Sequence, residues 1–178
     1  MREKKSLIAY YSRPGNNYVD GSIVNLRVGN TEVAAKMIQK LTGSDIFRID
    51  TIQEYPSDYH ETVDMTKEEL RQNARPVLSE HLDNMDEFDT VFLGYPNWFG
   101  TMPMATFTFL EEYDFSGKTI VPFCTHEGGG MGRSESDIKK LCPDSKVLEG
   151  LPIVGGNVQN AEKDIADWLA EVGEMEQK

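Results

Sequence analysis

The sequence has few cysteines and histidines and no long hydrophobic run. Its two cysteines, Cys124 and Cys142, are too few for a disulfide framework or a four-ligand zinc site. No apolar run approaches the roughly 20 residues that a membrane-spanning helix requires. The basic N-terminus is followed by an apolar run, Leu7 to Tyr11, which Arg13 ends. This run is shorter than the roughly 7–15 residues of the apolar core of a signal peptide. We therefore expect a cytoplasmic protein without a membrane segment.

Basic residues are also scarce, since 18 Lys and Arg stand against 30 Asp and Glu and give a formal net charge of −12 at pH 7. Such a surface repels nucleic acid and anionic lipid, so neither is expected as a partner, whereas basic protein surfaces are attracted. The 178 residues, 39% of them hydrophobic, suffice for one core and exclude a fully disordered chain. Because no internal repeat or linker is present, we expect a single domain over residues 1–178.

Short, continuously apolar runs predict the strands. Continuous rather than alternating apolarity is typical of strands buried on both faces. The expected strands are residues 6–11, 90–95 and 119–124, with an edge strand at 45–50 and a weaker fifth candidate at 145–148. Pro122 cannot donate a ladder hydrogen bond, so we expect a bulge or an early strand end near it.

Helical patterns lie between these runs. Apolar stripes predict helices over residues 31–41, 58–77, 103–113 and 161–172, and a further helix starts near Ser134. The alternation of strands and helices predicts an α/β fold with a three-layer, doubly wound, five-stranded parallel sheet.

The first segment that could carry chemistry follows the first strand, because ligands of open parallel sheets bind beyond the carboxyl ends of the strands. Ser12 and Arg13 come directly after this strand, and a polar extension then leads to Asn30 and Thr31, where the first helix begins. A helix N-terminus has unpaired N–H groups and a partial positive charge, which suit a phosphate, and the two hydroxyls would add neutral donors. The alternative is that Asn30 only caps the helix and Ser12 only forms a turn.

The second segment follows the third strand and comprises Pro96, Asn97, Trp98, Phe99 and Gly100. Loops seldom contain two adjacent large apolar side chains. The pair therefore suits a flat aromatic ligand, and the alternative is that both rings fold back into the core.

The third segment follows the fourth strand, where Thr125 and His126 precede a glycine cluster that includes Gly128, Gly129 and Gly130. Such glycines let the backbone approach a ligand edge and offer N–H donors, the alternative being a flexible loop without a partner. One loop thus suits a phosphate, one a flat ring and one polar ring edges. Together they outline a flavin mononucleotide (FMN).

These three motifs, in this order and each behind its own strand, resemble the flavodoxin-like family over most of the chain. The resemblance implies the strand order 2-1-3-4-5 and FMN as the cofactor. It assigns the phosphate to Ser12, Asn30 and Thr31, with Arg13 and Asn16 or Asn17 as additions. The family's phosphate loop is interrupted here by an insertion at about residues 13–28. Trp98 takes the ring-stacking position, and the backbone N–H groups of residues 97–100 and 128–130 would hold the ring edges.

The sequence also departs from the family pattern. The second flavin loop lacks the tyrosine that often covers the outer flavin face. Phe99 stands where many flavodoxins have a glycine, and a positive φ would be costly for it. The Pro-x-Trp-Phe-Gly pattern is closer to flavodoxin-like quinone reductases than to low-potential electron carriers.

The resemblance implies an FMN-binding redox protein that passes electrons through the flavin to a redox partner with a basic surface. In that role the flavin carries the chemistry, and no catalytic protein residue is expected. The alternative is an NAD(P)H-dependent quinone or nitro-compound reductase acting on a small quinone-like substrate. A non-redox, receiver-like binding module is a third alternative, but it needs acidic residues where the strands end in Tyr11-Ser12 and Tyr95-Pro96.

Overall fold

The computed structural model describes residues 4–174, and its centre is a parallel sheet. The strands of this sheet are β1 (Ser6–Tyr10), β4 (Asp45–Arg48), β5 (Thr90–Pro96), β6 (Thr119–His126), β7 (Lys146–Val147) and β8 (Leu151–Val154). They lie in the order β4-β1-β5-β6-β7, and β8 pairs with β6 beyond β7. The α/β class and the predicted order 2-1-3-4-5 are therefore confirmed, with the fifth position divided between β7 and β8.

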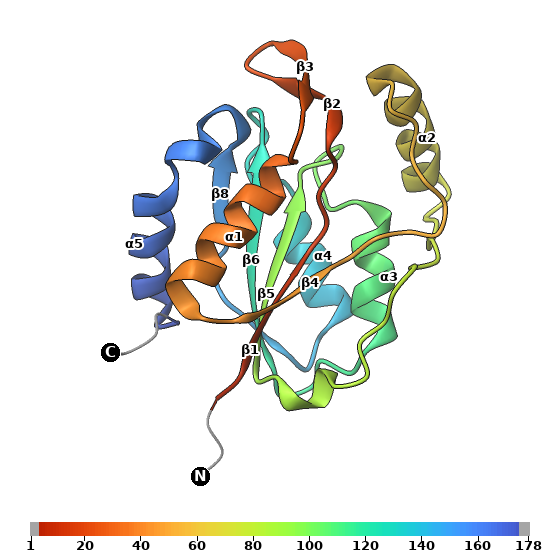
Figure 1. Ribbon diagram of the computed structural model, residues 1–178. Coiled ribbons are helices and arrows are strands. Elements are labelled where there is room, and N and C mark those ends of the chain that lie inside the picture. Colours follow the sequence, from red (N-terminus) through yellow and green to blue (C-terminus); the bar gives the residue numbers. More distant parts are fainter. Residues whose placement is uncertain (1–3, 175–178) are drawn as a thin grey trace.

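The helices are α1 (Asn30–Thr42), α2 (Tyr59–Arg71), α3 (Met104–Glu112), α4 (Ser134–Leu141) and α5 (Glu162–Val172), with short 3₁₀ helices at Met85–Glu87 and Gly155–Asn160. Helices α1 and α5 cover one face of the sheet and α3 and α4 the other, whereas α2 stands to one side beyond the strand ends (Figure 1). The helix expected over residues 58–77 is wrong at its end, because the chain after Gln72 turns and pairs Leu78 with Thr51.

The strands are buried on both faces, as their continuous apolarity predicts. In β1, Leu7 and Ala9 belong to the core beneath α3 and α4, while Ile8 and Tyr10 belong to the core beneath α1 and α5. Both cores end where the strands reach their carboxyl ends, so polar side chains can gather there.

Pro122 neither bulges nor ends its strand, so the expectation of an interruption in β6 is wrong. Strand β6 continues to His126, and its full length pairs with β5. The partner strand on the other side of β6 is interrupted instead. Strand β7 pairs with Thr119 and Ile120, and β8 pairs with β6 from Phe123 onward. The missing N–H of Pro122 thus coincides with the gap between two partner strands.

The insertion after β1 forms an antiparallel hairpin of β2 (Gly15–Val19) and β3 (Ser22–Leu26). Asp20 and Gly21 at its tip have φ values of 51° and 84°. Two positive φ values define the primed turn whose twist matches a hairpin, and Asp-Gly is one of its preferred sequences. The hairpin projects beyond the carboxyl end of the sheet, between α2 and the end of β8 (Figure 1).

Candidate functional site

A cavity of about 190 Å³ opens at the carboxyl ends of β1, β5 and β6, next to the hairpin. Its lining includes Ser12, Arg13, Asn30, Thr31, Pro96, Asn97, Trp98, Thr125 and His126, all of which the sequence predicts for one site. Asn17, Tyr18, Tyr59, Glu127 and Gly155 complete the lining. The three predicted loops therefore do meet at one place.

The N-terminus of α1 forms one wall of this cavity. Its cap is Gly29, not Asn30, so the alternative that Asn30 merely caps the helix is wrong. The buried Ser12 Oγ accepts a hydrogen bond from the Glu32 amide at 3.1 Å, which leaves its hydroxyl hydrogen for another acceptor. Among residues 4–174, no protein atom accepts from the amides of Asn30 and Thr31. These donors sit at the positive end of the helix dipole and suit a phosphate.

Gly29 has no room for a side chain. A Cβ at this position would lie 2.1 Å from Ser12 Oγ and 2.9 Å from the Arg13 carbonyl oxygen. Thr31 Oγ1 lies 2.8 Å from Thr125 Oγ1, which joins α1 to the end of β6. The polar wall is thus closely packed and preformed.

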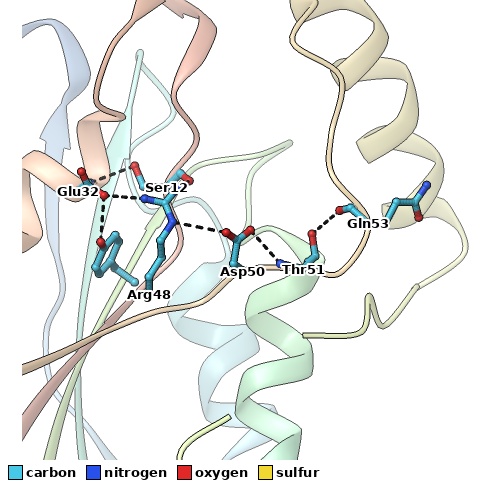
Figure 2. Close-up of polar contacts among 7 residues, drawn as sticks. Ser12, Glu32, Arg48, Asp50, Thr51 and Gln53 are labelled. Atoms are coloured by element: carbon cyan, nitrogen blue, oxygen red, sulfur yellow. Dashed lines mark hydrogen bonds and ion pairs between the residues drawn. The ribbon is translucent and has the colours of Figure 1, made fainter. Parts of the chain in front are cut away.

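The carboxylate of Glu32, in the first turn of α1, is paired with Arg48. Arg48 Nη1 lies 2.6 Å from its Oε1 (Figure 2). The Tyr10 hydroxyl donates to the same atom at 3.0 Å. Arg48 also donates to the Ser12 carbonyl oxygen at 2.8 Å, so it fixes the first loop. Burial, and secondarily Glu32, raises the pKa of Tyr10, which therefore remains a hydrogen-bond donor. Arg48 thus offsets the charge of Glu32 near the helix end, and its Nε also lies 3.7 Å from Asp50 Oδ2 (Figure 2).

Asn97 joins the second and third loops. Its Nδ2 donates to the Gly130 carbonyl at 2.8 Å, and its Oδ1 accepts from the Gly100 amide at 2.9 Å. A Cβ on Gly132 would lie 2.1 Å from the Gly100 carbonyl oxygen, so the two loops also touch through backbone. One side chain therefore sets the spacing of the two segments predicted to hold the ring.

The second loop turns through Phe99 and Gly100, whose φ values are 57° and 85°. The amide and carbonyl of Trp98 bond those of Thr101 across this turn, at 2.9 and 3.2 Å. The positive φ that is costly for Phe99 is nonetheless present, because the two-residue turn requires positive φ at both central positions. Its ring is 41% exposed, so the alternative of burial in the core fails for this residue.

Most of the loop amides expected to hold ring edges already have protein acceptors. The amides of Asn97, Trp98 and Gly100 bond within the site, and the Gly128 amide donates to His126 Nδ1 at 2.9 Å. Within the described part of the chain, the amides of residues 99, 129 and 130 have no such acceptor. Only these three stay available to a ligand.

Trp98 lines the cavity and packs partly on the core. Its ring meets Tyr11 and Tyr55 edge-on, with centroid separations of 5.3 and 5.8 Å. The Tyr55 hydroxyl donates to Glu69 at 2.8 Å, and burial raises the pKa of both Tyr55 and Glu69. The tryptophan is therefore held by neutral aromatic neighbours.

Arg13 lies where the first loop meets α2. Its guanidinium donates to the carbonyls of Asn16, Pro56 and Ser57 and to Thr62 Oγ1. Burial lowers the pKa of Arg13, which nonetheless stays protonated in proteins. No carboxylate forms an ion pair with it among residues 4–174, and Asp58 stabilises its charge from a longer distance.

Some predicted residues lie outside the cavity lining, namely Asn16, Phe99, Gly100, Gly128, Gly129 and Gly130. Asn17 takes the position predicted for Asn16 or Asn17. Tyr18 and Tyr59 were missed because the hairpin and α2 bring them in from outside the three loops. The hairpin had a detectable signal, since Asp20-Gly21 lies between β-forming residues. Tyr59 had none, because its place depends on how α2 packs.

Comparison with known proteins places this geometry among flavodoxins. A family model described as flavodoxin matches residues 5–172. Flavodoxin 1 of Escherichia coli K12 is 28% identical over 128 residues, which are 70% of this chain and 55% of that protein. The flavodoxin of Klebsiella pneumoniae is 30% identical over 118 residues, 64% of this chain and 49% of its own length. The chain spans about half the length of these curated relatives.

Two solved structures share the fold. A candidate flavoprotein of Bacteroides eggerthii superposes with a TM-score of 0.78 and 30% identity, over 96% of this chain and 99% of that one. A flavoprotein of Lactobacillus acidophilus, solved in complex with FMN, superposes with a TM-score of 0.63 at 19% identity, over 89% and 98% of the two chains. Within residues 4–174, no helix has the length and apolarity to cross a membrane.

Proposed function

The chain belongs to the flavodoxin family, and from that premise we propose that it is an FMN-dependent electron-transfer protein. The observation that carries the proposal is the α1 N-terminus, where free amides, the Ser12 hydroxyl and the absent side chain of Gly29 form a cradle. A phosphate monoester fits this donor set, because it accepts several hydrogen bonds and its charge meets the helix dipole.

The remaining lining suits the rest of FMN. Pro96, Asn97, Thr125 and His126 line the same cavity as the phosphate cradle and Trp98, and their polar groups suit a polyhydroxyl chain. A Cβ on Gly155 would lie 2.4 Å from Glu127 Oε1, so the Glu127 and Asn30 side chains pack closely against this glycine. FMN, when bound, supplies the redox chemistry, and the protein supplies binding and electrostatics.

The chain's own residues act by positioning. Ser12 and the α1 amides hold the anionic end, Arg48 keeps Glu32 from repelling it, and Asn97 fixes the two loops around the ring. No side chain is required as a nucleophile.

The acidic surface supports a protein partner with a basic docking surface, because opposite charges steer such encounters. A second candidate is a reductase of small quinones or nitro compounds. The exposed side chain of Phe99, which lines a cavity next to the site, favours it as an apolar surface against which a flat substrate can pack.

The test is a visible spectrum of the FMN-loaded protein during stepwise reduction. A yellow protein with one flavin per chain supports the proposal, and reduction in two separate one-electron stages supports the carrier. Direct two-electron bleaching by a nicotinamide cofactor, followed by reoxidation with a quinone, supports the reductase. A protein that stays colourless after addition of FMN overturns both and revives a flavin-free binding role.

A further inference from the structure

A groove of about 700 Å³ runs between β8 and α5, which lie next to each other at one edge of the molecule (Figure 1). Residues 149–154, which include all of β8, form one side of it, and residues of the second 3₁₀ helix and of α5 form the other. We call it the β8 groove. No residue that lines it also lines the cavity proposed for FMN, so it is a separate feature of the surface.

Strand β8 leaves one edge of the sheet open along this groove. It pairs with β6, and no strand within residues 4–174 pairs with its other edge. Such an edge presents unpaired backbone N–H and C=O groups, to which an extended segment of another chain can add as a further strand. Pro152 agrees with this position, because proline within sheets is largely confined to edge strands.

Trp168 of α5 joins the two sides of the groove. Its Nε1 donates to the Glu149 carbonyl at 3.0 Å, and its ring packs against Phe92 and Phe123 at centroid separations of 6.3 and 6.5 Å. Both sides are therefore fixed to the core, and the groove is a permanent part of the fold.

The charged residues that line the β8 groove are all acidic, namely Glu149, Asp164, Asp167 and Glu171. Lys163 pairs with Asp167 at 2.7 Å and attracts Asp164 from a longer distance. In the described part of the chain, the carboxylates of Glu149 and Glu171 have neither an ion pair nor a hydrogen bond. Because like charges along a groove repel one another, a cationic ligand is favoured there and the same face of a second copy is disfavoured.

The length of the groove suits a short extended segment. Its α5 side reaches from Ala161 to Val172, which at the helical rise of about 1.5 Å per residue spans about 16 Å. An extended chain rises about 3.3 Å per residue, so about five residues cover this distance. Alternate side chains of a strand face the same side, so every second residue of such a segment would meet the acidic wall.

We propose that the β8 groove docks an extended basic segment of a partner protein, which adds as a strand to β8 and sets alternate Lys or Arg side chains against the carboxylates of α5. Val154 lines the groove, and the next residue, Gly155, lines the cavity proposed for FMN. A partner held in the groove therefore lies beside that cavity. The inference rests on the proposed function only for the redox role of the partner.

The test is a fluorescence anisotropy titration of a peptide with the FMN-loaded protein at low ionic strength. The peptide is acetyl-Lys-Val-Lys-Val-Lys-amide with a neutral coumarin label. We expect saturable binding of one peptide per chain, weakened by added salt, and no binding of the matched Glu-Val-Glu-Val-Glu peptide. A Lys-Val peptide N-methylated at its three central residues keeps its charge but loses those backbone donors, and it should bind at least about threefold more weakly.

Paired charge reversals locate the binding. Glu149→Lys combined with Glu171→Lys should weaken peptide binding at least about tenfold, because two unpaired groove carboxylates become cations. Glu54→Lys combined with Glu80→Lys gives the same net charge but changes exposed residues near β4, at the opposite edge of the sheet. This control should weaken binding less than about threefold, since distant charges are screened. The FMN content should be the same in all three proteins.

Three results would overturn the inference: no saturable binding to the wild type, equal weakening by the two double variants, or equal affinity for the N-methylated peptide. A wild type that dimerises through the β8 groove and so excludes the peptide would overturn it as well. A protein that binds the peptide in this way but binds no FMN would overturn the proposed function and leave the docking groove intact.

Discussion

Replacing Asn97 by Ala tests whether one side chain holds the two ring-binding loops in place. The change removes a bond of 2.8 Å to the Gly130 carbonyl and one of 2.9 Å from the Gly100 amide. Each intramolecular hydrogen bond contributes about 1 kcal/mol, so the pair is worth about 2 kcal/mol. In the variant, FMN binding must itself order the two loops that Asn97 no longer holds together. The loss of about 2 kcal/mol then lowers the favourable free energy of FMN binding. The FMN dissociation constant should then rise by up to about 30-fold.

The assay is titration of the apoprotein with FMN, followed by the quenching of flavin fluorescence. Asn84→Ala is the control, because Asn84 is an asparagine before the 3₁₀ helix that precedes β5, at the opposite end of that strand from the site. It should leave the dissociation constant unchanged. An Asn97→Ala protein that binds FMN within twofold of the wild type would refute the reasoning.

Three further predictions concern packing, backbone strain and burial. Gly29→Ala should weaken FMN binding at least about tenfold in the same titration. The new Cβ would lie 2.1 Å from Ser12 Oγ and would push this hydroxyl out of its position. Unchanged affinity would place the phosphate elsewhere. The free energy of unfolding of Phe99→Asn, measured in urea, should be about 1 kcal/mol higher than that of Phe99→Ala. Both variants lose the ring, but only Asn tolerates φ 57°; equal stability would show that the turn is unstrained. Burial raises the pKa of the Cys124 thiol to about 12, so ionisation of the unfolded thiol from about pH 8.5 upward favours unfolding. Between pH 8 and pH 10 the wild type should therefore lose about 2 kcal/mol more stability than Cys124→Ala, whereas parallel losses would contradict the raised pKa.

The sheet could be predicted from the sequence because burial on both faces makes its strands continuously apolar. Leu7 to Tyr10 show this directly, since neighbouring residues alternate between the two cores. The place of the site followed from the same reasoning, because the carboxyl ends of parallel strands meet at one edge.

The rest depends on tertiary packing that no local pattern encodes. Pro122 is tolerated in β6 because its neighbour changes from β7 to β8 at that point, a coincidence invisible in the run itself. Tyr18 and Tyr59 reach the site through the hairpin and α2, and their rings lie 6.4 Å apart. The φ of Phe99 is set by the two-residue turn, which overrides the residue's own preference.

The most direct test of the account compares the affinities of the apoprotein for FMN and for riboflavin, which lacks the phosphate. If the α1 N-terminus, Ser12 and the space at Gly29 hold that group, FMN should bind at least about 100-fold more tightly, because charge-assisted hydrogen bonds contribute about 1.5–3 kcal/mol each. The preference should shrink as salt is added. Equal affinity for the two flavins, or binding of neither, would contradict the central claim.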